Sequence, residues 1–171
     1  MSFDPRGFNN LVEKVLPKQL RTLRDQIKKD PPSLETLSKE SLLLIRKRFG
    51  VNKGDFAGCY VLIKNGSPFY VGISRKVISR LRQHFKGKSH FDASLAYRMA
   101  KDKIGQNKFY LTRDEAMRDK TFKNLFIKAK SNLLKAKVVF VKMESAEERY
   151  LFEIYAAMQF NTFKWNSFDT H

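Results

Sequence analysis

Arginine, histidine and glutamate side chains at helical spacing are the first residues in this chain that could do chemistry. Arg80 and His84 are four residues apart, so they are neighbours on one face of a helix predicted over residues 75–86. At about 100° per residue, both lie just beside the apolar stripe of that helix, where side chains line a cleft. The alternative is that Arg80 packs its methylene groups along the core and His84 is an ordinary surface imidazole.

Glu153 has a similar position on a helix predicted over residues 145–158. It lies beside an apolar stripe that we expect to be buried, made of Tyr150, Leu151, Ile154, Ala157 and Met158. A lone carboxylate in a basic chain is a reasonable ligand for Mg²⁺, which keeps several waters and takes one or two carboxylates plus phosphate oxygens. The alternative is an ordinary surface ion pair between Glu153 and Arg149.

The charge of the chain points to a polyanionic partner. The formal net charge is +17, from 34 Lys and Arg against 17 Asp and Glu, and 42% of the 171 residues are hydrophobic. This composition is typical of a globular protein whose field attracts nucleic acid backbones. A ribosome-associated protein and an acidic membrane surface are the alternatives. The single cysteine, Cys59, excludes an internal disulfide, and we expect it to be a small core residue.

Membrane contact is not expected. No apolar stretch approaches the roughly 20 residues of a spanning helix, and residues 1–10 lack the apolar core of a signal peptide. We therefore expect a cytoplasmic protein.

Two short aromatic peptides, Gly58-Cys59-Tyr60 and Tyr70-Val71-Gly72, lie ten residues apart and precede these side chains. GIY-YIG nucleases resemble this chain in the order of five elements. These are a Gly-x-Tyr strand, a Tyr-x-Gly strand, an Arg-x-x-x-His helix, a later helix with one metal-binding Glu, and then an Asn. The residues that match are Tyr60, Tyr70, Arg80, His84, Glu153 and Asn166. The resemblance covers about residues 58–168.

Some positions depart from the family pattern. Cys59 and Val71 are conservative replacements of the isoleucines in the two tripeptides. The thirteen residues from Glu153 to Asn166 leave Glu148 as a second candidate metal ligand, less favoured because it lies in the first turn of its helix. Asn166 itself would brace the site.

The resemblance implies a metal-dependent endonuclease that hydrolyses phosphodiester bonds in DNA. Tyr60 would position or deprotonate the attacking water, with His84 as a relay or as the alternative general base. Arg80 would hold the scissile phosphate through its guanidinium fork. Glu153 would ligate one Mg²⁺ or Mn²⁺ near the leaving group.

Tyr70 would hydrogen-bond the phosphate or the water, and this role needs both phenols on one face of a β-hairpin. A strict two-residue turn at Asn65-Gly66 would pair Tyr60 with Val71 and send the two phenols to opposite faces. Convergence requires an odd loop or a bulge, for which Pro68 is a plausible place. We predict a loop of three or five residues.

Two basic surfaces are candidates for gripping the substrate. Residues 74–90 contain six Lys or Arg and no acidic residue, and residues 101–137 contain eleven basic against four acidic residues. The second stretch includes the aromatic residues Phe109, Tyr110, Phe122 and Phe126. The alternatives are a solvated face for the charges and a core position for the aromatic rings. The predicted substrate-binding residues are Gly72, Arg75, Lys76, Arg82, Lys86 and Lys88.

The remaining patterns predict the elements that position these side chains. Helices are expected over residues 8–29, with Pro17 as an interruption, and over 33–48, opening at Ser33. Strands are expected on both sides of Asn65-Gly66, and residues 138–143 predict a strand buried on both faces. Further helices are expected at 91–104, 112–119, 121–134 and 145–158, the last capped by Ser145.

This order predicts an α+β fold with a small, mainly antiparallel sheet, made of the hairpin plus a later central strand and flanked by helices. We expect residues 1–50 to be an N-terminal helical accessory segment and residues 51–171 to be the GIY-YIG-type core. The expected function is a restriction-type or mobile-element endonuclease acting on double-stranded DNA, with a homodimer as the expected assembly. The alternative is a non-catalytic nucleic-acid-binding protein on the same scaffold.

Overall fold

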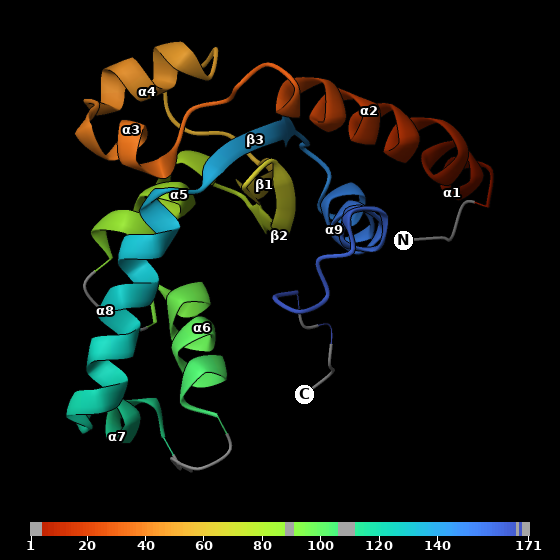
Figure 1. The fold of residues 1–171 in the computed structure, drawn as a ribbon. Helices are drawn as coiled ribbons and strands as arrows, with labels where there is room; N and C mark the ends of the chain where they lie inside the picture. Colours follow the sequence, from red (N-terminus) through yellow and green to blue (C-terminus); the bar gives the residue numbers. More distant parts are fainter. Residues whose placement is uncertain (1–4, 88–90, 106–111, 167, 169–171) are drawn as a thin grey trace. The chain divides into compact units, whose positions relative to one another are not determined.

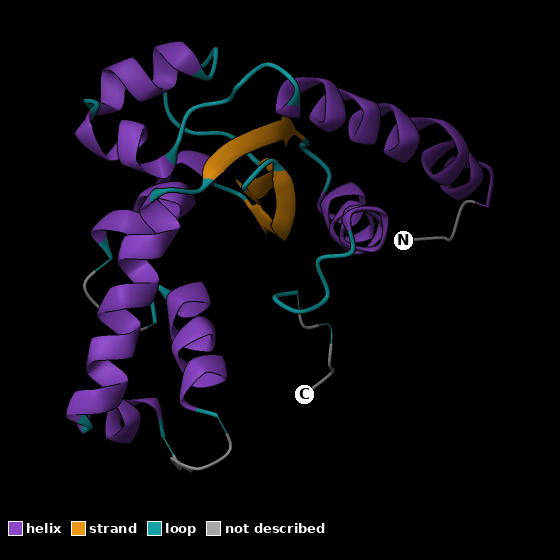
Figure 2. Ribbon diagram, viewed as in Figure 1, coloured by secondary structure: helices purple, strands orange, loops and turns teal. Residues whose placement is uncertain are grey.

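The computed structural model describes residues 5–87, 91–105, 112–166 and 168 (Figure 1). It combines helices with a small sheet, as the α+β prediction requires (Figure 2). The chain forms two compact units. The first unit consists of Met1–Pro32, Lys53–Val77 and Lys137–His171, and the second of Ser33–Asn52 and Ile78–Ala136. The boundary at residue 50 between an accessory segment and a core stays a prediction.

The sheet of the first unit has three antiparallel strands in the order β2-β1-β3. These are β1 (Gly58–Lys64), β2 (Ser67–Ser74) and β3 (Lys137–Lys142). The prediction that the later strand is central was wrong, because β1 is central and β3 lies at an edge. The apolar run of β3 has another cause: Val139 and Val141 enter the main core, while Phe140 packs its ring 5.0 Å from that of Phe56.

Gly58 allows the close approach of β1 and β3. A Cβ at this position would lie 2.2 Å from the carbonyl oxygen of Val141. No side chain fits there, so the first glycine of the aromatic tripeptides is required by strand packing.

The N-terminal helical segment belongs to the first unit. Its parts are α1 (Pro5–Asn10), the π-helical η1 (Leu11–Val15) and α2 (Leu16–Ile27). Pro17 does not end the helical segment, because it lies in the first turn of α2, where its missing N–H is tolerated. The five π-helical residues precede it, and a π-helical stretch is a local departure from the regular ladder of hydrogen bonds.

Helices α2 and α9 (Ala146–Phe160) supply the side chains that cover one face of the sheet. The shared cluster includes Leu20, Leu23, Cys59, Val61, Val71, Val139, Phe152 and Ala156. Cys59 is fully buried, as predicted. Because side chains alternate along a strand, Tyr60 and Tyr70 point to the opposite face.

The buried stripe of α9 differs from the prediction. Tyr150, Ile154 and Met158 are 62%, 44% and 61% exposed, whereas Phe152, Ala156 and Ala157 are buried. Apolar residues occupy both sides of this helix, so its period alone could not select the packed side. The alanines allow the helix to lie close to the sheet.

The second unit is helical. Its elements are α3 (Leu34–Lys39), α4 (Leu42–Arg48), α5 (Val77–Lys86, whose first residue belongs to the first unit), α6 (Ser94–Ile104), α7 (Arg113–Arg118) and α8 (Lys120–Leu134). The helix predicted over residues 33–48 is divided in two. Ser33 caps α3 by accepting from Thr36 N (3.0 Å), as predicted, and Ser41 caps α4 by accepting from Leu44 N (3.2 Å).

The packing of α6 against α8 forms the core of this unit. Phe122 and Phe126 are buried, and the ring centroids of Tyr97 and Phe122 are 5.0 Å apart. These two phenylalanines are therefore core residues, which was the alternative to a role in nucleic acid binding. Phe109 and Tyr110 lie outside the described residues. None of the helices that the described residues form combines the length and the apolar composition needed to cross a membrane.

Candidate active site

The hairpin brings Tyr60 and Tyr70 to the same face of the sheet. Tyr60 pairs with Gly72 and Leu62 pairs with Tyr70, but the register then shifts, so that Ile63 pairs with Pro68. The predicted loop length was wrong: Asn65 and Gly66, with φ of 51° and 77°, form a two-residue turn. A bulge beside Pro68 supplies the extra residue. A bulge was the second of the two arrangements expected to bring both phenols to one face.

The two phenols lie in contact on that face. Their ring centroids are 6.1 Å apart, with an angle of 60° between the ring planes. The ring of Tyr60 also lies over its strand partner: a Cβ at Gly72 would be 2.6 Å from the phenolic oxygen of Tyr60 and 2.5 Å from Cζ. Glycine is the residue that leaves room for this phenol. Gly72 is itself buried, and its predicted contact with substrate stays a prediction.

Asn166 holds the backbone between the second phenol and Gly72. The amide N–H of Val71 donates to Asn166 Oδ1 (3.0 Å), and Asn166 Nδ2 donates to the carbonyl of Val71 (2.7 Å). The hydroxyl of Thr162 also lies 3.0 Å from Asn166 Oδ1. Since β2 is an edge strand, this carboxamide satisfies the groups that a further strand would otherwise bind. These contacts fit the bracing role predicted for Asn166.

Glu153 lies on the packed side of α9 and is half-buried. At about 100° per residue it falls between the buried residues Arg149 and Ala157, not at the edge of an exposed stripe. Burial, followed by the charge of Glu153, raises the pKa of the Cys59 thiol well above its ordinary value. Because α9 packs on the face of the sheet that carries Cys59, Glu153 lies on the side opposite to the phenols of Tyr60 and Tyr70.

The guanidinium of Arg149 is held by backbone carbonyls. Its Nη1 donates to the carbonyls of Met143 (2.8 Å) and Glu144 (2.7 Å), which follow β3. Glu148, the second candidate metal ligand, lies in the first turn of α9, and burial raises the pKa of its carboxyl group.

Arg80 is held within the second unit. Its Nη1 donates to Gln83 Oε1 (2.9 Å) and to the carbonyl of Asp92 (3.0 Å), and its Nη2 donates to the hydroxyl of Ser94 (3.0 Å). These acceptors are neutral, so they orient the guanidinium fork without neutralising its charge. A fork fixed in this way is suited to bind a phosphate.

His84 is fully buried in the second unit rather than at the border of a cleft. Burial, followed by the charges of Arg80 and Arg98, lowers the pKa of His84 to about 3. The imidazole is therefore neutral at physiological pH. A group with such a low pKa is a weak proton acceptor.

The candidate residues are divided between the two units. Tyr60, Tyr70, Glu153 and Asn166 belong to the first unit, and Arg80 and His84 belong to the second. Sequence reasoning missed the side chains that hold these residues in place: Gln83, Ser94 and Thr162. The spacings of Gln83 from Arg80 and of Thr162 from Asn166, three and four residues, are local signals that could have found two of them.

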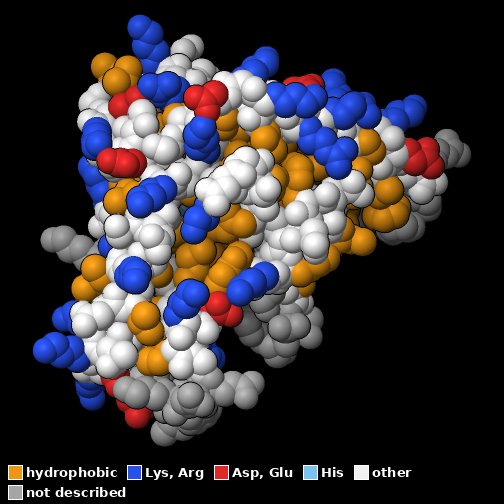
Figure 3. Space-filling model, in the orientation of Figure 1, with side chains coloured by type: hydrophobic (Ala, Val, Ile, Leu, Met, Phe, Trp, Pro, Cys, Tyr) orange, Lys and Arg blue, Asp and Glu red, His pale blue; other side chains and the backbone are white. Residues whose placement is uncertain are grey.

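Most of the predicted substrate-binding cations that the structure describes are exposed. Arg75, Lys76 and Lys86 are exposed and Arg82 is half-buried, whereas Lys88 lies outside the described residues. In the space-filling view, Lys and Arg side chains greatly outnumber Asp and Glu on the face shown (Figure 3). This surface chemistry suits a polyanionic partner.

The chain belongs to the GIY-YIG family. A sequence model of the GIY-YIG catalytic domain matches residues 56–158, which is more than half of the chain. The match contains Tyr60, Tyr70, Arg80, His84 and Glu153 and ends before Asn166. The family is one of nuclease domains, so membership implies endonuclease activity on nucleic acid.

The fold was also compared with solved structures. The chain is similar to two crystal structures of the GIY-YIG N-terminal endonuclease domain of UvrC from Thermotoga maritima, both point mutants bound to the catalytic divalent cation. The sequence identities are 14% and 13%, and the TM-scores are 0.37 and 0.36. In both cases the similarity covers 74% of this chain and 99% of the other. No curated protein sequence matches the chain.

Proposed function

We propose that this protein is a divalent-metal-dependent endonuclease that cuts double-stranded DNA. The observation that supports this most directly is the convergence of Tyr60 and Tyr70. The roles that the family resemblance implies for these two residues require both phenols on one face of the hairpin. We further propose a restriction-type or mobile-element enzyme that acts in the cytoplasm. A double-strand cutter with one site per chain needs two chains, so the proposed assembly is a homodimer.

Hydrolysis of a phosphodiester needs a positioned water and donors that stabilise the charge on the phosphoryl oxygens. We assign the water to Tyr60 and the phosphate to Arg80, with Tyr70 as a second hydrogen-bond donor. A buried, neutral His84 is better suited to hold a hydrogen bond than to take a proton. Tyr60 is therefore the preferred general base, in a form that nearby cations must stabilise.

Glu153 is the proposed metal ligand. Among the described residues, no three His, Cys, Asp or Glu side chains gather into a cluster that could hold a metal ion. A single carboxylate fits Mg²⁺ or Mn²⁺, which complete their coordination with waters and phosphate oxygens. When bound, such an ion stabilises negative charge on the phosphoryl and leaving oxygens.

One experiment tests the proposal. Supercoiled plasmid DNA is incubated with the protein, with and without Mg²⁺, alongside the variants Tyr60→Phe, Arg80→Ala and Glu153→Gln. We expect cleavage that requires Mg²⁺ and falls by at least about 100-fold in each variant. Tyr150→Phe is the matched control, because it removes a hydroxyl from an exposed tyrosine and should cut normally.

The outcomes separate the enzyme from its alternative. Wild-type protein that binds DNA but leaves it uncut would favour the non-catalytic nucleic-acid-binding protein. Normal cleavage by the three variants would instead refute the residue assignments while leaving the nuclease in place.

A further inference from the structure

The two units carry very different charges. By sequence, the second unit contains 19 Lys and Arg against 7 Asp and Glu, a net charge of +12. The first unit contains 15 against 10, a net charge of +5, although it is the longer of the two. The second unit therefore dominates the field that attracts a polyanion.

Among the helices described in that unit that contain no acidic residue, α8 carries the largest number of cations. Its fifteen residues, Lys120–Leu134, contain four lysines and no acidic residue. The apolar side chains Phe122, Phe126, Ala129 and Leu133 are buried, which fixes how the helix is rotated about its axis. Asp119, which precedes the helix, caps it by accepting from the amide of Phe122 (2.9 Å).

Three of these lysines, together with Lys135 at the C-cap, fall on two sides of this buried stripe. Lys123 and Lys130 are seven residues apart and thus lie within about 20° of each other. Lys128 and Lys135 have the same spacing on a side about 140° away. The second pair lies on the side of α3, where the pKa of Glu35 is lowered mainly by Lys39 and to a smaller extent by the charge of Lys135.

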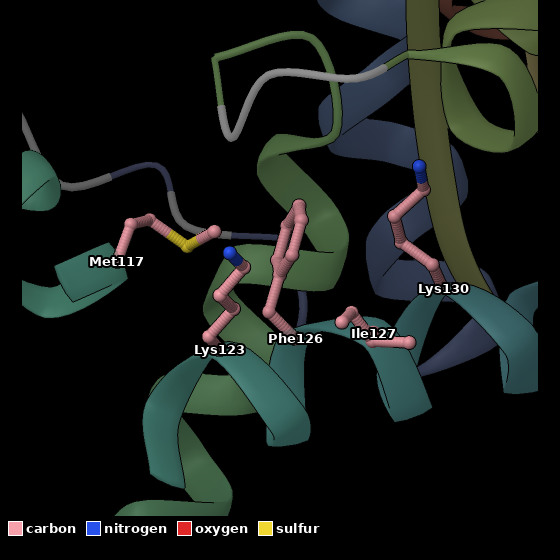
Figure 4. Close-up of a pocket in the computed structure, with 5 residues that line it drawn as sticks. All are labelled: Met117, Lys123, Phe126, Ile127 and Lys130. Atoms are coloured by element: carbon pink, nitrogen blue, oxygen red, sulfur yellow. The ribbon is translucent and has the colours of Figure 1, made fainter. Parts of the chain in front are cut away.

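The first pair also flanks a hollow in the surface. Lys123, Lys130, Phe126, Ile127 and Met117 of α7 line it (Figure 4). Ile127 is 55% exposed, and the ammonium of Lys130 lies 6.0 Å from the centre of the Phe126 ring and donates to the carbonyl of Gly87. The hollow thus offers two cations about 10 Å apart along the helix, with apolar surface between them.

We propose that the Lys123 and Lys130 side of α8 binds the phosphate backbone of the DNA. The ammonium groups contact separate phosphates, and the apolar surface of Ile127 and Met117 faces the sugars between them. This inference rests on the proposed function, because it assigns a grip on the same substrate. On this helix, the side with Lys123 and Lys130 then binds phosphate, and the side with Lys128 and Lys135 faces solvent.

Salt dependence of binding distinguishes the two sides. A fluorescein-labelled DNA duplex is titrated with full-length protein in EDTA over a range of salt concentrations, and the slope of log affinity against log salt is measured. We expect the slope of Lys123→Gln to be about 1 smaller than that of wild type, and the slope of Lys123→Gln/Lys130→Gln to be about 2 smaller. The control Lys128→Gln/Lys135→Gln removes the same charge at the same spacing and should keep the wild-type slope.

Two further measurements keep the test decisive. Because Lys130 also holds Gly87, thermal melting checks the double variant, and Lys123→Arg should retain the wild-type slope since it keeps the charge. Equal slopes for the two double variants would overturn the inference, because neither side of α8 would then be distinguished as the phosphate-binding side. Failure of the wild-type protein to bind any DNA would instead overturn the proposed function.

Discussion

The phenol of Tyr60 occupies the space that a side chain at Gly72 would fill. The two residues are direct partners in the pairing of β1 with β2, and a Cβ on Gly72 would lie within 2.8 Å of three atoms of the Tyr60 side chain. Real Cβ atoms do not approach other atoms so closely, so the glycine and the position of the phenol depend on each other. The position of the Tyr60 phenol therefore explains why the second tripeptide ends in a glycine, Gly72.

Gly72→Ala should displace the phenol of Tyr60. We expect a loss of about 1–3 kcal/mol in the free energy of unfolding and a fall in cleavage rate comparable with that of Tyr60→Phe. Denaturant unfolding and plasmid cleavage measure the two effects. In a Tyr60→Ala background the same substitution should cost much less stability, because the clashing ring is gone. An equal cost in both backgrounds would contradict this explanation.

Asn166 should act through the backbone of β2. Asn166→Asp keeps an acceptor for Val71 N–H but loses the donor to Val71 O, and its charge is buried. We expect a loss of about 1–3 kcal/mol in the free energy of unfolding, measured by urea denaturation, together with slower cleavage. Thr162→Val is the graded control, since it removes one hydrogen bond to Asn166 and should cost about 1 kcal/mol. If both variants were as stable as wild type, the clamp would have no energetic role.

Gln26 binds the backbone of the edge strand β3, as Asn166 binds the backbone of the edge strand β2. Its Nε2 donates to the carbonyl of Phe140 (2.8 Å), and its Oε1 accepts from the amide of Phe140 (3.1 Å). Phe140 lies directly opposite Tyr60 on β3. The strands on both sides of Tyr60 are thus held by carboxamides from distant parts of the chain.

Gln26→Leu should loosen this edge, because it leaves two part-buried backbone groups of Phe140 without these partners. We expect a loss of about 1–3 kcal/mol in the free energy of unfolding and a lower kcat with little change in KM. Gln159→Leu is the matched control: Gln159 is exposed and accepts a hydrogen bond from Arg24 (3.3 Å), so its loss should change stability by less than about 0.5 kcal/mol. Equal effects of the two substitutions would refute the special role of Gln26.

His84 should make the protein sensitive to mild acid. Its pKa is lowered from 6.5 to about 3 in the folded state, so the unfolded chain takes up a proton between these values that the folded chain does not. The free energy of unfolding is therefore highest above pH 6.5. It decreases as the pH is lowered from 6.5 to about 3, by up to about 1.4 kcal/mol per pH unit. Chemical denaturation at a series of pH values measures it.

Arg98→Met provides the check on this pH dependence. It removes one of the two cations that lower the pKa of His84, so that pKa should rise in the folded state. The loss of stability should still begin near pH 6.5, but it should end at a higher pH and be smaller in total. A pH dependence that this variant leaves unchanged would show that other groups cause the acid sensitivity.

The sequence was informative where the signals are local. Asn65-Gly66 predicts a hairpin because both residues tolerate positive φ, and Ser33 and Ser145 predict helix starts because their hydroxyls accept from backbone amides. The ordered residues of the family pattern could likewise be read directly. Each of these features is decided within a few residues of chain.

Long-range contacts could not be read in the same way. The bulge beside Pro68 was expected as one of two solutions, because a shared face for Tyr60 and Tyr70 requires an irregular ladder. The contact between Gln26 and Phe140 spans 114 residues and leaves no periodic signal. The packed side of α9 depends on which of two apolar faces meets the sheet, and both Ile154 and Phe152 fit a helical stripe.

Removal of the divalent metal should abolish cleavage, and Glu153 should be the residue that accounts for it. Cleavage in excess EDTA should fall to background and return on addition of Mg²⁺ or Mn²⁺. Glu153→Gln keeps the size of the side chain but removes its charge, so it should bind the ion more weakly and cut at least about 100-fold more slowly at saturating DNA. Calorimetric titration with Mn²⁺ measures the binding independently of activity.

Glu148→Gln is the matched control for this assignment, because it makes the same change in the first turn of the same helix. Burial raises the pKa of the Glu148 carboxyl group, which makes it the poorer ligand of the two. We expect Glu148→Gln to retain both Mn²⁺ binding and cleavage. If it lost them while Glu153→Gln kept them, the metal ligand would be Glu148, and the half-buried carboxylate of Glu153 would have a structural role beside Cys59.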